Sequence, residues 1–164
     1  MFDLHSIQAS IKEFRLDGWL LCDFRGSNGP ARRVLGLDDK PVGSRRFFYM
    51  IPSNGPPLKL VHAIEPKALE HLPGETSIYR SWPELEQGLV HLTDGACRIA
   101  MEYAPNLSNP YISRVDGGTI EAVRRLGVEI ASSGDLIQLY EAALDDDQWR
   151  MHLGAEKVTT SAFE

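Results

Sequence analysis

The hydrophobic residues of the chain form two kinds of pattern, one with helical spacing and one of short, wholly apolar runs. The first pattern opens the chain, with apolar residues three or four positions apart: Leu4, Ile7, Ile11 and Phe14. This spacing predicts an amphipathic helix over residues 3–17 that stops at Gly18. Residues 19–22 are apolar throughout and too few for a helix, which predicts a buried strand ending near Asp23.

The same alternation continues along the chain. Further strands are predicted at residues 46–51, 58–61, 76–79, 98–101 and 128–131, and further helices at 31–35, 66–71, 81–92, 119–126 and from 134 onwards. In the helix from Gly134, one face is predicted to hold Leu136, Leu139, Tyr140 and Ala143. The turn at residues 53–56 is so short that the strands beside it must form an antiparallel hairpin. The pattern therefore predicts an α/β fold, in which helices cover both faces of a mixed, mostly parallel β-sheet with one antiparallel hairpin.

The last twenty residues predict one more helix. Asp145, Asp146 and Asp147 suit a helix N-terminus, and a stripe of apolar residues follows at intervals of three and four: Met151, Ala155, Val158 and Ala162. We expect residues 1–144 to form one domain and residues 145–164 to begin a helix that leads into a catalytic domain outside this sequence. The alternative is a terminal helix that docks on the sheet.

Composition and charge narrow the class of protein. The chain has 164 residues, 43% of them hydrophobic, with a formal net charge of -6. This balance predicts one soluble domain and disfavours binding to nucleic acid, whose phosphates need a concentrated positive surface. With no secretory leader and no apolar run of membrane-spanning length, a cytoplasmic location is expected. Two basic pairs, residues 32–33 and 45–46, are predicted to be solvated, and Cys22 and Cys97 to be buried thiols in parallel core strands.

The usual catalytic patterns are missing from the sequence. It contains no HExxH, HxH, CxxC or GxSxG motif, and its five histidines are scattered singly. Asp116 is predicted to cap a helix, His62 to lie at the surface or a sheet edge, and the tryptophans at 19, 82 and 149 to serve packing. We therefore expect no catalytic residue, no metal site and no cofactor in these residues.

The order of several short motifs resembles the amino-terminal domain of the creatinase, prolidase and Xaa-Pro aminopeptidase family of metallopeptidases. The similar segments are the helix-to-strand passage at 16–21, the loop at 23–37, the hairpin at 45–66, the Ala-Met-Glu-Tyr strand end at 100–103 and the exit at 132–141. The resemblance covers nearly the whole chain. A tyrosine that is common in this family before the loop's Leu35-Gly36 is replaced by Val34.

The resemblance implies a supporting role beside a catalytic domain. In this family a following domain binds a pair of divalent metals (manganese, cobalt or zinc) through two aspartates, one histidine and two glutamates. The amino-terminal domain builds dimer contacts and narrows the entrance for short peptides. The residues of this chain expected to position peptides or form an interface are Asp23, Arg25, Asn28, Arg32 and Arg33.

Two other functions stay open at this point. The chain could be a stand-alone module that binds a peptide or a protein, which predicts no exposed apolar stripe at residues 149–163. It could also be the amino-terminal domain of a creatinase-like hydrolase that is not a peptidase. The ligands that would distinguish a peptidase from a creatinase lie in the following domain.

Overall fold

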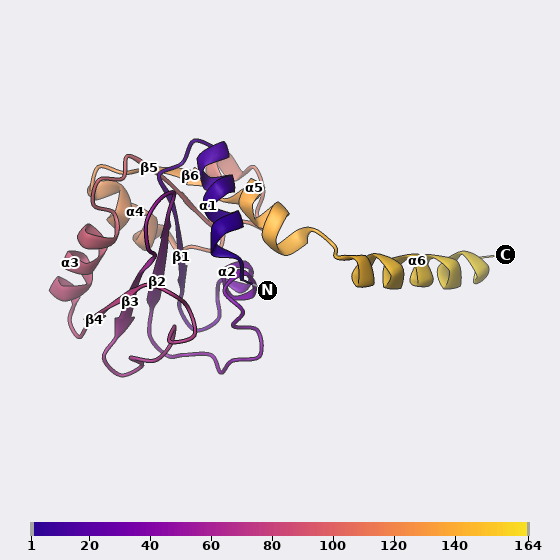
Figure 1. The fold of residues 1–164 in the computed structure, drawn as a ribbon, viewed down its shortest axis with the longest axis horizontal. Helices are drawn as coiled ribbons and strands as arrows, with labels where there is room; N and C mark the ends of the chain where they lie inside the picture. The colour runs from indigo at the N-terminus through magenta and orange to yellow at the C-terminus, as the bar shows by residue number, and fades with distance from the viewer. Residues whose placement is uncertain (1, 164) are drawn as a thin grey trace.

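Six strands form one mixed sheet in the order β4-β3-β2-β1-β5-β6, in a computed structural model that describes residues 2–163 (Figure 1). The strands are β1 Gly18–Asp23, β2 Phe47–Pro52, β3 Leu58–His62, β4 Glu75–Tyr79, β5 Arg98–Met101 and β6 Glu129–Ser132. Only β2 runs antiparallel to its neighbours, β1 and β3, and the other five strands share one direction. The predicted mixed, mostly parallel sheet and its β2–β3 hairpin are confirmed.

Helices cover both faces of this sheet. The helices of the domain are α1 Leu4–Glu13, α2 Gly29–Val34, α3 Trp82–Leu92, α4 Gly117–Arg125 and α5 Gly134–Ile137. Helices α1, α2 and α5 bury their apolar residues in one core, and α3 and α4 in the other. Successive residues of β1 alternate between these cores, so Trp19 and Leu21 face the first while Leu20 and Cys22 face the second. All six residues of β1 are therefore buried.

Two predicted helices end differently in the structure. Helix α1 stops at Glu13 rather than at residue 17, because Arg15 takes a left-handed φ of 56° and the amide of Leu16 bonds back to Ile11. Helix α5 continues as a π-helical turn, Gln138–Ala142, whose wider winding changes which residues face the core. Ile137 is buried beside Leu136, whereas Leu139 is 49% exposed, so the predicted apolar face is wrong at Leu139.

The predicted helix at residues 66–71 is wrong, since this segment forms a succession of turns. Its backbone hydrogen bonds join residues three positions apart, as in turns, and the carbonyls of Leu69 and Leu72 also bind a side chain of the sheet. The ammonium group of the buried Lys59 on β3 donates to the carbonyl of Leu72 at 2.8 Å and to that of Leu69 at 3.4 Å. A buried ammonium group needs such acceptors, which stabilise the non-helical path.

The last helix of the described chain, α6 Asp146–Ser161, extends away from the α/β domain (Figure 1). The carboxylate of Asp145 accepts from the amide of Gln148, whose side chain accepts from the amide of Asp145 in return, so a capping box starts the helix. All of its residues are exposed, including Trp149, Met151 and Val158. The predicted helix is confirmed, and it does not dock on the sheet. No helix within residues 2–163 combines the length and the apolarity that crossing a membrane requires.

Candidate functional site

The loop that follows β1 is held by the carboxylate of Asp23. This side chain is buried, and it accepts hydrogen bonds from the amides of Gly26 at 3.0 Å and Asn28 at 2.9 Å. Arg32, also buried, lies 3.5 Å from the same carboxylate and donates to the carbonyls of Leu37 and Lys40. The loop is thus pulled back onto the carboxyl end of β1 by contacts within the protein.

Glu102, directly after β5, ties this loop to the core. Its carboxylate is fully buried and accepts from the indole N–H of Trp19 and from the side-chain amide of Asn28, each at 2.7 Å. Asn28 also donates to the carbonyl of Cys22 and caps α2 by accepting from the amide of Ala31. Burial raises the pKa of Glu102, and its two hydrogen bonds act in the opposite direction. We call Glu102, Trp19, Asn28 and Asp23 the Glu102 network; it connects β1 and the end of β5 with the loop that follows β1.

The five residues predicted to position peptides or form an interface have different environments. Asp23, Asn28 and Arg32 are buried together, with their polar groups engaged inside the loop. Arg33 is exposed and pairs with Glu141 on the π-helical turn. Arg25 is exposed, has a left-handed φ of 56°, and lines a pocket. Of the five, Arg25 and Arg33 are the exposed ones, and a functional role for each of the five stays a prediction.

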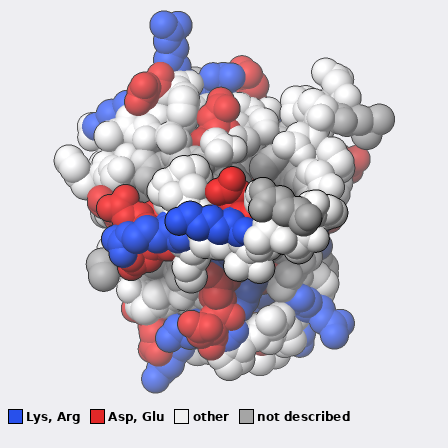
Figure 2. Space-filling model, turned by 90° about the vertical axis from the view of Figure 1, so that its right-hand side faces the viewer, with Lys and Arg blue, Asp and Glu red and all other residues white. Residues whose placement is uncertain are grey.

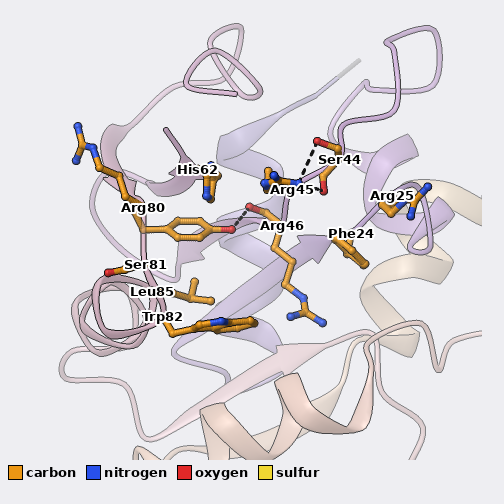
Figure 3. Close-up of a pocket in the computed structure, with 11 residues that line it drawn as sticks. Phe24, Arg25, Ser44, Arg45, Arg46, His62, Arg80, Ser81, Trp82 and Leu85 are labelled. Atoms are coloured by element: carbon orange, nitrogen blue, oxygen red, sulfur yellow. Dashed lines mark hydrogen bonds between the residues drawn. The ribbon is translucent and has the colours of Figure 1, made fainter. Parts of the chain in front are cut away.

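This pocket, which we call the edge pocket, has a volume of about 660 Å³ and lies where several strands end (Figure 3). Phe24 and Arg25 follow β1, His62 ends β3, and Tyr79 ends β4. The opening of α3 adds further residues, Ser81, Trp82 and Leu85, and the segment before the antiparallel β2 adds Ser44, Arg45 and Arg46. The carboxyl edge of a parallel sheet is where open α/β proteins commonly bind ligands.

The lining of the edge pocket is positively charged. It contains four arginines and one histidine and no carboxylate. Arg46 lies over the ring of Phe24 at 5.1 Å and pairs with Asp116 at 3.2 Å. Burial raises the pKa of the Tyr79 hydroxyl, while Arg46 and Arg45 act to lower it. By contrast, the face seen along α6 mixes acidic and basic side chains (Figure 2). A positive pocket in a chain of net charge -6 is suited to an anion.

Several residues of this pocket differ from their sequence predictions. Trp82 is 70% exposed, so the prediction that it serves packing is wrong, and the exposed Trp149 departs from it in the same way. Arg46 is less exposed than expected of a solvated pair, with 28% of its side chain accessible. His62 ends an inner strand, with its ring edge-on to Tyr79 at 4.9 Å. The sequence feature that could have indicated this pocket is the pair of arginines directly before an apolar strand. Only the folded structure places these arginines in the same pocket as Trp82.

The other chemical predictions have mixed outcomes. Asp116 caps α4 by accepting from the amide and the hydroxyl of Thr119, as predicted. Cys22 is a buried free thiol whose pKa is raised by burial, as predicted, but Cys97 is exposed because it precedes β5. Within residues 2–163 no group of three or more histidine, cysteine, aspartate or glutamate side chains could hold a metal ion.

Comparison with known proteins identifies structures that share this fold. The sequence matches no protein-family model, and a search of curated proteins gives no significant match. The structure is similar to a prolidase from Thermococcus sibiricus, with a TM-score of 0.61 and 17% identity. It is also similar to a proline dipeptidase from Streptococcus pneumoniae, with a TM-score of 0.59 and 16% identity. A third match, at 13% identity and a TM-score of 0.60, is the creatinase/prolidase amino-terminal domain of an X-Pro dipeptidase from Streptococcus pyogenes.

The matches cover different fractions of the known proteins. The match covers 88% of this chain and 100% of the Streptococcus pneumoniae chain, and 82% and 95% with the Streptococcus pyogenes domain. With the prolidase of Pyrococcus horikoshii it covers 90% of this chain but only 37% of that protein, and with the Thermococcus prolidase 98% and 41%. The chain therefore has the fold of a creatinase/prolidase amino-terminal domain and spans about two fifths of the length of those two prolidases.

Proposed function

We propose that this chain is the non-catalytic amino-terminal domain of a metallopeptidase that acts on short Xaa-Pro peptides. In this proposal the chain contributes to a dimer and restricts and positions peptides at a metal site in a domain that follows α6. A pair of divalent metals (manganese, cobalt or zinc) would there activate a water molecule for attack on the peptide bond. The residues of this chain contribute binding and orientation.

The proposal rests on a difference in coverage between two groups of matched structures. Chains of domain size are matched almost completely, whereas two prolidases are matched over about two fifths of their length. The match with the Thermococcus prolidase covers 98% of this chain, so it must include most of α6. If the chain is the amino-terminal domain of such a protein, we expect the match to include both the α/β domain and the helix that follows it.

The exposure of α6 favours this function over a stand-alone binding module. A stand-alone module predicts no exposed apolar stripe at residues 149–163. In the structure the residues of the predicted stripe, Met151, Ala155, Val158 and Ala162, are all exposed at or near α6. An exposed row of apolar residues on a helix is typical of a surface that packs against another part of the protein or a partner. In our proposal that part is the following domain.

The loop after β1 supports a role in positioning peptides. The Glu102 network fixes its start, so Arg25 leaves the sheet from a rigid base. A guanidinium can hold the terminal carboxylate of a peptide through two parallel hydrogen bonds. We propose that Arg25 makes this contact and that Asp23, Asn28 and Arg32 act indirectly, by holding the loop.

Replacing Arg25 with alanine in the complete gene product tests this role. We expect the KM for an Xaa-Pro dipeptide to rise about ten-fold, because a charge-assisted hydrogen bond to the substrate is lost, while kcat changes less. Arg15→Ala is a matched control, because Arg15 is also an exposed arginine with a φ of 56° but precedes β1 at the opposite end of the strand. Unchanged KM and unchanged oligomeric state in Arg25→Ala would contradict the role.

A further inference from the structure

The edge pocket combines a cationic lining with an accessible aromatic ring. Its volume of about 660 Å³ lies within the range of small-ligand sites. We infer that the edge pocket binds a small organic anion with a flat ring, its carboxylate or phosphate held by Arg46 and Arg45 and its ring stacked on Trp82. The edge pocket shares Arg25 with the proposed peptide contact, but the residues proposed here to hold the ligand, Arg45, Arg46 and Trp82, have no part in that contact.

Arg46 has the position of an anchor. Figure 3 shows its side chain extending between Phe24 and Trp82, with Arg25 and Arg80 on opposite sides of the pocket. The ring of Phe24 beneath its guanidinium restricts the side chain, and only 28% of that side chain is exposed. Restricting an arginine before binding reduces the entropy lost when it grips an anion. Arg45 is adjacent and exposed, so it can add a second guanidinium.

Three carboxylates interact with arginines of the lining or with their backbone amides. Glu65 accepts from the amides of Ser44 and Arg45, and Glu84 accepts from the amide of Arg80, so both bind main-chain groups. Asp116 is the one of the three that pairs with an arginine side chain of the lining, Arg46, and it also caps α4. A ligand anion would therefore share Arg46 with Asp116 and meet no carboxylate in the lining itself.

Trp82 supplies the ring-binding surface. Its side chain is 70% exposed although it opens a helix whose next inward residue, Leu85, is buried. A second hollow of about 360 Å³ between α3 and α4 shares Arg46, Trp82 and Leu85 with the edge pocket. The indole therefore borders both hollows, and a ring can stack on it from either one. An anion without a ring would leave this surface unused.

The experiment follows the three tryptophan indole N–H resonances of the 164-residue chain by NMR. The probes are AMP, which offers a phosphate and a purine, and N-acetylphenylalanine, which offers a carboxylate and a phenyl ring. We expect at least one of them to shift the Trp82 resonance in a saturable way and to leave that of Trp19, which is buried on Glu102, unchanged. Trp82→Phe assigns the resonance. Comparing the two probes shows whether the pocket prefers phosphate or carboxylate.

The controls separate the anchor from general attraction. Arg46→Gln is expected to weaken binding of the active probe about ten-fold, because a charge-assisted contact is lost. Arg150→Gln removes the same charge from the exposed helix α6 and should leave binding unchanged. Inorganic phosphate and N-acetylphenylalanine amide, which each lack half of the ligand, should bind at least about ten-fold more weakly. Absence of a shift with both ring-bearing probes, equal binding by Arg46→Gln, or equal binding of inorganic phosphate would overturn the inference.

Discussion

Replacing Glu102 with alanine is expected to lower the free energy of unfolding by about 3 kcal/mol, because two buried donors lose their acceptor. The indole N–H of Trp19 and one side-chain N–H of Asn28 both point at this carboxylate at 2.7 Å. Trp19, Asn28 and Glu102 are all buried, so water cannot replace the missing oxygen without opening the core. Urea unfolding of the variant measures the change.

Two further variants identify the cause of this loss. Glu102→Gln keeps the size of the side chain and one carbonyl acceptor but turns an amide group toward one of the two donors, so we expect an intermediate loss. Glu129→Ala removes an exposed glutamate whose carboxylate pairs with Arg98 on the adjacent strand, and it should change stability by less than about 0.5 kcal/mol. If Glu102→Ala were as stable as Glu129→Ala, the Glu102 network would not support the loop after β1.

Replacing Gly74 with alanine is expected to destabilise the chain by about 3 kcal/mol, for two reasons that add. Gly74 has a φ of 108°, a conformation that residues with a side chain rarely adopt. A Cβ atom there would also lie 2.2 Å from the carbonyl oxygen of Pro57. That carbonyl accepts from the amide of Glu75, where the pairing of β3 with β4 begins, so relieving the contact would disturb the pairing. Thermal or urea unfolding tests this.

Gly55 in the β2–β3 turn is the matched control. Its φ of 87° is also positive, but a Cβ atom there would meet nothing within 4 Å. Gly55→Ala therefore carries the backbone strain without the collision, and we expect a loss of about 1 kcal/mol. Equal losses at the two positions would show that conformational strain alone explains the effect at Gly74. A larger loss at Gly74 is the result that the contact with Pro57 predicts.

The four inner strands β1, β2, β3 and β5 could be predicted because their short apolar runs are buried within the sheet. Residues 19–22 are apolar without interruption, and β1 is covered on both faces. The hairpin could be predicted because its turn is too short for any other connection. The segment at 66–71 could not, since its path depends on the buried Lys59, whose acceptors become visible only once β3 is placed. Likewise, helical spacing alone does not reveal the π-helical turn at Gln138–Ala142.

The candidate site was harder to predict than the fold. The loop after β1 was identified from its charged residues, but burial of Asp23 and Arg32 distinguishes them from the exposed Arg25 only in the structure. The edge pocket collects residues from four separate segments, including Arg46 and Trp82, which are far apart in the sequence. The local sequence pattern around each of these residues does not predict that they lie close together in the fold. The strand order shows that they do, because the start of the antiparallel β2 lies beside the ends of β1 and β3.

Reading the gene beyond the codon for Glu164, followed by assay of its complete product, tests the central proposal most directly. The proposal predicts a reading frame that continues into a domain with two aspartates, one histidine and two glutamates as metal ligands. It also predicts that the product hydrolyses Xaa-Pro peptides with manganese or cobalt and does not hydrolyse creatine. A stop codon directly after Glu164 would contradict the proposal, as would a following domain that lacks these ligands.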